Sequence, residues 1–135
     1  MRAVLSRSDT KLCLRSLPDY LASKPMNDQL PMEISVSESQ ARRLSEEPPL
    51  FLDVRENFEL EIAHLSPDLH IPMTQLAERW QDIPRDKPIV AYCHHGKRSL
   101  NVTDFLRERG LIQVQSMIGG IDAWSLQVDP TVPRY

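Results

Sequence analysis

Residues 89–99 are Ile-Val-Ala-Tyr-Cys-His-His-Gly-Lys-Arg-Ser, and this stretch carries a clear structural pattern. Its first half is β-branched, aromatic and uncharged, which is typical of a strand buried on both faces of a sheet. Residues 99–109 follow with apolar side chains at helical spacing, and Gly110 stands where a helix commonly ends. The stretch therefore predicts a buried strand, a polar loop that begins at Cys93, and a helix.

The same alternation of short apolar runs and helical segments continues on both sides of this unit. Residues 50–54 are predicted to form a second buried strand, with Asp53 and Arg55 at its polar end. Strands that alternate with helices favour a parallel sheet of the α/β class. The other expected elements are a helix opened by a Ser37-Glu38-Ser39-Gln40 capping box, one or two helical turns over 56–63, a short strand around Ile71, a helix over 74–80 with Thr74 as its N-cap, a strand over 114–117, a tight turn at Gly119-Gly120 and a last helical turn over 121–125.

The overall composition is that of a single soluble globular domain. The chain has 135 residues, of which 41% are hydrophobic and 26% are charged, and its formal net charge is -3. The sequence has neither the roughly 20 consecutive apolar residues of a membrane span nor the basic excess that binds a nucleic-acid backbone. Two cysteines cannot form a disulfide framework. We therefore expect a cytoplasmic protein that contacts neither a membrane nor nucleic acid.

The first residues differ in charge from the rest of the chain. Residues 1–25 contain five basic and two acidic side chains, against a net charge of -3 for the whole sequence. We predict that residues 1–32 form a poorly ordered N-terminal extension and that residues 33–135 form the domain. One alternative is an organelle-targeting segment, because the stretch is poor in acidic residues and contains Arg and Ser. Another is a natural start at Met26 or Met32.

Cys93 lies at the junction of a predicted strand and a predicted helix, where open α/β sheets bind their ligands. The unpaired N–H groups at a helix start carry about half a positive charge, and Lys97 and Arg98 add two full charges nearby. These effects favour the thiolate, which is the nucleophilic form of cysteine. Gly96 allows the backbone N–H groups to curl into an anion-binding nest. The alternative is an inert buried thiol at a strand end.

Four segments of the chain form an ordered set that covers about residues 33–126. They are Asp53-Val54-Arg55, Glu59 with His64-Leu65, the Cys-x-x-Gly-x-Arg-Ser loop of residues 93–99, and the Gly-Gly-x-x-x-Trp of residues 119–124. This set resembles the rhodanese-like sulfurtransferases, whose first strand ends in Asp-x-Arg and whose second segment is Glu-(aromatic)-x-x-Gly-His-Ile. Two positions differ from the family: Leu60 stands in place of the aromatic residue and Ala63 in place of the glycine.

The resemblance implies a fold, a reaction and a set of site residues. The fold is α/β, a small parallel β-sheet flanked by helices on both faces. The reaction is sulfur transfer through a persulfide on Cys93, from a small anionic donor such as thiosulfate to cyanide, a thiol or a partner protein. Neither a metal nor an organic cofactor is expected. The substrate-binding loop would consist of His94, His95, Gly96, Lys97, Arg98 and Ser99, with Asp53 and Arg55 as supporting residues.

Two other functions share parts of this pattern. Phosphatases and arsenate reductases also combine a cysteine, a backbone cradle and an arginine, but the phosphatase loop has five residues between Cys and Arg. Only four residues separate Cys93 from Arg98, and the shorter loop makes a bowl that suits one sulfur atom better than a phosphate. A catalytically silent rhodanese-like binding module is expected to lack the cysteine.

The remaining candidates have mainly structural interpretations. We expect Asp53 and Arg55 to form a structural ion pair that anchors neighbouring loops, with a catalytic pair as the alternative. Cys93, His94 and His95 are adjacent and do not easily converge on one metal ion; one imidazole is expected to line the cleft and the other to face solvent. Ser99 is expected at or near the helix N-cap.

Three further predictions concern the two ends of the chain. Cys13 is expected to be an incidental thiol, with a resolving thiol for Cys93 as the alternative. Trp124 is expected to pack against one side of the sheet. Residues 128–135 are expected to form an extended surface segment, because their prolines prevent a helix.

Overall fold

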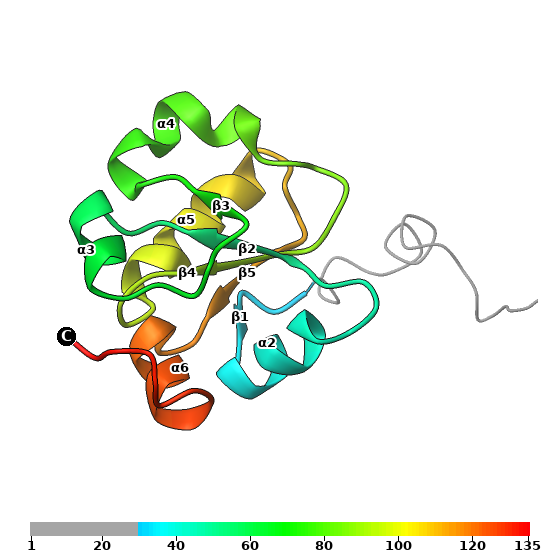
Figure 1. Cartoon of the computed structure of the whole chain (residues 1–135). Helices are drawn as coiled ribbons and strands as arrows, with labels where there is room; N and C mark the ends of the chain where they lie inside the picture. Colours follow the sequence, from blue (N-terminus) through cyan, green and yellow to red (C-terminus); the bar gives the residue numbers. More distant parts are fainter. Residues whose placement is uncertain (1–29) are drawn as a thin grey trace, which may run out of the picture.

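The computed structural model describes residues 30–135, which contain a parallel five-stranded sheet (Figure 1). The strands are β1 (Glu33–Ile34), β2 (Leu50–Asp53), β3 (Leu69–His70), β4 (Ile89–Tyr92) and β5 (Val114–Met117). Their order is β1-β5-β4-β2-β3, so β4 lies at the centre. Every neighbouring pair is parallel, which brings the carboxyl ends of all strands to one edge. The predicted parallel α/β sheet is confirmed.

Helices cover both faces of this sheet. They are α2 (Val36–Arg43), α3 (Asn57–Ile62), α4 (Leu76–Arg79), α5 (Lys97–Glu108) and α6 (Gly120–Gln127), with 3₁₀ turns η2 (Met73–Gln75) and η3 (Trp80–Asp82) beside α4. Strand side chains alternate between two buried apolar clusters. One cluster contains Leu76 of α4 and Leu106 of α5. The other contains Val36 of α2 and Trp124 of α6, so the predicted packing of Trp124 against the sheet is confirmed.

The predicted start of the first helix is wrong by two residues. Ser35, rather than Ser37, is the N-cap of α2, and its hydroxyl oxygen accepts a hydrogen bond from the backbone N–H of Glu38 at 3.1 Å. Val36 then becomes the first helical residue, and its side chain is buried against the sheet. Burial of this side chain accounts for the earlier start.

Two other predicted helix starts also differ from the structure. Thr74 lies inside η2, where its hydroxyl contacts the Glu56 carboxylate at 3.1 Å and caps no helix. α5 begins at Lys97 with Gly96 as its N-cap, so Ser99 is the third residue of that helix. The left-handed backbone of Gly96, with φ 102°, allows the helix to start immediately after the loop.

The predicted N-terminal extension lies largely outside the described residues, and so do Cys13 and Met26. Residues 30–32 lie beside β5, because the backbone N–H of Ser116 donates to the carbonyl of Met32 at 2.8 Å. Arg107 of α5 donates to the carbonyl oxygens of Leu30 and Pro31, each at 2.8 Å. The boundary between residues 32 and 33 stays a prediction. No helix in the described part of the chain combines the length and the apolar character of a membrane span.

Candidate active site

Cys93 directly follows β4 at the carboxyl edge of the sheet, and its side chain is almost fully buried. The sulfur atom accepts hydrogen bonds from two backbone N–H groups, that of Gly96 at 3.0 Å and that of Ser99 at 3.4 Å. Both donors belong to the start of α5, where the helix dipole is positive. The loop therefore surrounds the sulfur with groups that stabilise negative charge on it.

Ser99 connects this loop to the neighbouring strand. Its hydroxyl group donates to the carbonyl of Gly96 at 3.2 Å, lies 3.5 Å from the sulfur of Cys93, and shares a 2.7 Å hydrogen bond with the hydroxyl of Ser116 on β5. All of these side chains are buried. Ser116 was not among the predicted site residues, because no local pattern relates a strand serine to a loop 17 residues earlier in the chain.

Arg98 is held by Glu59 of α3. Its two terminal nitrogens donate to the two carboxylate oxygens at 2.8 and 2.9 Å, in the bidentate geometry that arginine favours. Glu59 is buried, and its hydrogen bonds with Arg98 lower its pKa to about 2 despite that burial. The same hydrogen bonds raise the pKa of Arg98. Arg98 thus braces the loop, and Lys97, which is exposed, is the neighbouring cation that faces solvent.

Asp53 and Arg55 form a fully buried ion pair at the end of β2, with an N–O distance of 2.7 Å. Arg55 also donates to the carbonyl of Ala63 at 2.8 Å and to the hydroxyl oxygen of Tyr135 at 2.9 Å. Burial opposes the charge on Arg55, but the hydrogen bonds with Asp53 and Tyr135 outweigh it and raise the pKa of Arg55. These contacts tie the end of β2 to the C-terminal end of α3 and to Tyr135.

His94 and His95 differ in exposure. The rings stack on each other with centroids 3.9 Å apart, and His94 also stacks on Tyr135 at 3.8 Å and 6°. Burial, followed by the neighbouring His95, lowers the pKa of His94. The side chain of His95 is 65% exposed and lies 3.9 Å from the Asp122 carboxylate. His95 is therefore the imidazole that faces solvent, and His94 is the one enclosed by the site.

The donor atoms of His94, His95 and Asp122 lie within 4.8 Å of one another, which raises the question of a metal site. A metal bound to imidazole lies in the plane of the ring, and the two stacked rings are only 23° from parallel. Their lone pairs therefore do not converge, and Asp122 is already paired with Arg134 at 2.8 Å. This cluster does not fit a metal ion in the geometry observed.

The start of α6 closes the other side of the loop. The backbone N–H of Ile121 donates to the carbonyl of Cys93 at 2.8 Å, and that of Asp122 donates to the carbonyl of His94 at 3.1 Å. This approach requires glycine at position 120, where φ is 62° and a Cβ atom would lie only 2.4 Å from the Cys93 carbonyl oxygen. The Gly-Gly pair recognised in the sequence thus places a helix N-terminus against the cysteine loop.

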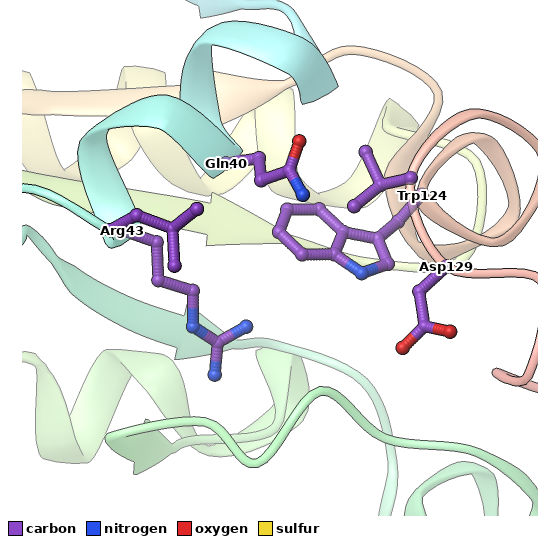
Figure 2. A pocket seen from close by; sticks show the side chains of 6 residues that line it. Gln40, Arg43, Trp124 and Asp129 are labelled. Carbon is purple, nitrogen blue, oxygen red and sulfur yellow. The ribbon is translucent and has the colours of Figure 1, made fainter.

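A separate cleft of about 400 Å³ lies between α2 and α6, on the side of the sheet that carries Trp124 (Figure 2). Its labelled side chains are Gln40, Arg43, Trp124 and Asp129. Arg43 already has partners, because its guanidinium lies 4.6 Å from the ring centre of Phe51 and donates to backbone carbonyls. None of the residues predicted for the site lines this cleft.

Known proteins with similar sequences and structures share this cysteine-loop domain. The family of rhodanese-like domains matches residues 37–127. An adenylyltransferase and sulfurtransferase of Zea mays, MOCS3-2, is 32% identical over 135 residues, covering 87% of this chain; the chain spans only 28% of that relative's length. The thiosulfate sulfurtransferase GlpE of Haemophilus influenzae is 31% identical over 71% of this chain and 94% of its own. The crystal structure of a rhodanese-related protein from Thermoplasma volcanium superimposes with a TM-score of 0.68, at 30% identity, over 78% of this chain and 100% of that one.

Proposed function

Because this chain belongs to the rhodanese-like sulfurtransferase domains, we propose that it moves sulfane sulfur from a small anionic donor such as thiosulfate to a thiophilic acceptor. Cys93 carries the sulfur as a persulfide between the two halves of the reaction. The observation that carries this proposal is the sulfur atom of Cys93 at the start of α5, with the N–H groups of Gly96 and Ser99 directed at it. Such donors stabilise an anionic sulfur before, during and after the transfer.

The proposed transfer has two steps. The Cys93 thiolate attacks the outer sulfur of thiosulfate, the sulfur–sulfur bond of the donor breaks, and sulfite leaves with the bonding electron pair. An acceptor then attacks the outer sulfur of the persulfide; cyanide becomes thiocyanate, and the Cys93 thiolate is regenerated. A thiol or a partner protein takes the place of cyanide in a cell, and a reducing compartment keeps Cys93 available for the next turnover.

The charges around the loop assign separate roles to its cations. Arg98 is occupied by the buried Glu59 carboxylate, so it holds the loop in shape. Lys97 is exposed on the loop and is the side chain that would attract an anionic donor. A phosphatase needs its arginine for the phosphate oxygens, and the pairing of Arg98 with Glu59 favours sulfur transfer over that alternative.

The test is intact mass spectrometry of the reduced, desalted protein after incubation with thiosulfate. We expect a gain of one sulfur atom that disappears when cyanide is added. Cys93→Ala should abolish the gain, and Cys13→Ala, which removes the other cysteine of the chain, should retain it. A gain that persists in Cys93→Ala would overturn the proposal. The absence of any mass gain with either thiosulfate or mercaptopyruvate would also overturn it. In that case, hydrolysis of a phosphate ester would support the phosphatase alternative.

A further inference from the structure

Tyr135 lies against the cysteine loop although the two are far apart in the sequence. Its ring stacks face to face on His94, with centroids 3.8 Å apart and planes 6° from parallel. Its hydroxyl accepts a hydrogen bond from Arg55 at 2.9 Å and donates one to Glu59 at 2.8 Å. One side chain thus touches the loop through its ring and the supporting ion pairs through its hydroxyl.

The hydroxyl of Tyr135 joins two ion pairs that are otherwise held by different elements. Asp53 and Arg55 form one pair at the end of β2, and Glu59 and Arg98 form the other between α3 and the cysteine loop. Without the hydroxyl, Nη1 of Arg55 keeps only a 3.4 Å contact with the backbone carbonyl of Glu59. A buried guanidinium N–H without a good partner is unfavourable, so the hydroxyl stabilises the orientation of both pairs.

The segment 129–135 is anchored before it reaches the loop. Val132 is buried in the cluster that contains Trp124, and its carbonyl accepts a hydrogen bond from the hydroxyl of Ser125 at 2.7 Å. Arg134 pairs with Asp122 of α6 at 2.8 Å. These contacts with α6 hold the segment in the position that places Tyr135 against His94. The predicted extended surface segment over 128–135 is therefore confirmed only in part: residues 130–132 form a turn, in which the backbone N–H of Val132 donates to the carbonyl of Asp129 at 3.1 Å, and Tyr135 contacts the site.

Resting on the proposed sulfur transfer, we propose that Tyr135 is a positioning residue of the Cys93 loop. Its ring fixes His94, the residue next to the reacting sulfur, and its hydroxyl fixes Glu59 and through it Arg98. The N–H groups that hold the sulfur belong to the loop bounded by these contacts. Loss of Tyr135 therefore lowers the rate of the chemical step more than it weakens donor binding, because the geometry of the loop matters most in the transition state.

Two substitutions separate the ring from the hydroxyl. Tyr135→Phe keeps the stack and removes the hydroxyl with both of its hydrogen bonds, and we expect the maximal rate of persulfide formation to fall about fivefold or more. Tyr135→Leu removes both contacts, and we expect a fall of more than about tenfold with KM for thiosulfate changed by less than about threefold. Thr131→Ala is the matched control: Thr131 lies in the same segment, is exposed, and hydrogen-bonds only to Asp129 in the described structure.

The experiment combines these rates with the NMR shifts of the His94 ring protons, assigned with His94→Gln, at a temperature where circular dichroism shows every variant folded. The His94 protons should lie further upfield in wild type and Tyr135→Phe than in Tyr135→Leu, where only the His95 ring still stacks on His94. Wild-type rates in Tyr135→Leu, or equal losses in Thr131→Ala and Tyr135→Leu, would overturn the positioning role. If the wild type forms no persulfide, the sulfur-transfer proposal fails, and the His94 shifts decide the positioning role alone. A His94 shift in Tyr135→Leu equal to that of wild type overturns the role, and a smaller upfield shift in that variant supports it.

Discussion

Glu59 is the residue at which the supports of the cysteine loop meet. Its carboxylate accepts hydrogen bonds from Arg98 and Tyr135, and also from the backbone N–H of Glu56 in the capping box of α3. The side chain is only 6% exposed, so its charge is stabilised by these donors instead of by water. Protonation of this one carboxyl would weaken the loop, the helix start and the contact with Tyr135 together.

The lowered pKa of Glu59 predicts a dependence of stability on pH. The pKa is about 2 in the folded protein, against 4.5 for an unpaired glutamate. Because the folded value is the lower one, the stabilisation is complete above pH 4.5 and is lost as the pH falls toward 2; it amounts to roughly 3 kcal/mol. Glu59→Gln has no such titration. We therefore expect wild type to exceed Glu59→Gln in free energy of unfolding at about pH 6, with more than half of the difference lost by about pH 3.

Urea unfolding followed by tryptophan fluorescence at about pH 6, 4 and 3 measures this difference. Glu61→Gln is a control, since Glu61 is exposed on the same helix. A constant difference between wild type and Glu59→Gln across this pH range would contradict the assignment.

At the residue scale, local patterns identified some parts of the site and could not identify others. Cys93, Gly96 and Arg98 follow one another in a recognisable order, and the structure brings them together around the start of α5. Tyr135 and Ser116 carry no local signal, because their contacts with the loop depend on how distant segments pack. The prolines near Tyr135 correctly exclude a helix after α6, but the absence of a helix does not reveal the turn at 130–132 or what the side chain of Tyr135 contacts.

At the scale of elements, the approach of α6 to the cysteine loop depends on a glycine pair. Gly119 is the N-cap of α6 and Gly120 its first residue, and both have positive φ. Gly120 has the backbone of Cys93 and His94 within 2.6 Å of the place where a Cβ atom would stand. Backbone atoms cannot move aside as a flexible side chain can, so any larger residue would separate α6 from the loop.

We expect Gly120→Ala to be far more harmful than Gly110→Ala, although both glycines have positive φ. At Gly110, which follows the end of α5, the added Cβ would meet only the flexible end of Arg85 at 3.3 Å. Gly110→Ala should therefore cost about 1–2 kcal/mol from backbone strain alone. Gly120→Ala adds the backbone clash and should cost more than about 3 kcal/mol while abolishing persulfide formation. Urea denaturation of both variants measures the difference, and equal losses would show that strain, and not the clash, dominates.

The element boundaries show where local rules have several solutions. Ser35 and Ser37 each precede, by three residues, a side chain that suits a capping box, so the sequence alone offers two starts for α2. The choice is made by Val36, whose burial against the sheet favours the earlier start. Strands β2 and β4 were located correctly because each is an apolar run that directly follows a proline, Pro49 or Pro88. β5 was also located correctly, although two of its four residues are polar. β3 has two residues, both only partly buried, and such a short strand is defined mainly by its pairing with β2.

At the scale of the whole molecule, stability comes from two apolar layers on either side of one sheet. Leu106 of α5 is completely buried in one of them, whereas Leu126 of α6 is 60% exposed. Leu106→Ala should lower the free energy of unfolding by about 2–5 kcal/mol through lost contacts and a residual cavity. Leu126→Ala, the same change on another helix, should alter it by less than about 0.5 kcal/mol. Thermal and urea unfolding of both variants provide the check, and comparable losses would mean that α5 is not a core helix.

The two outer strands of the sheet, β1 and β3, contain only two residues each. A long exposed strand offers a row of unpaired N–H and C=O groups on which another chain can add a strand, and this is a common route to fibres. In this protein each edge strand offers too few unpaired N–H and C=O groups to hold an incoming strand in register. The brevity of β1 and β3 therefore protects a fully parallel sheet from growing by self-association when the protein is concentrated.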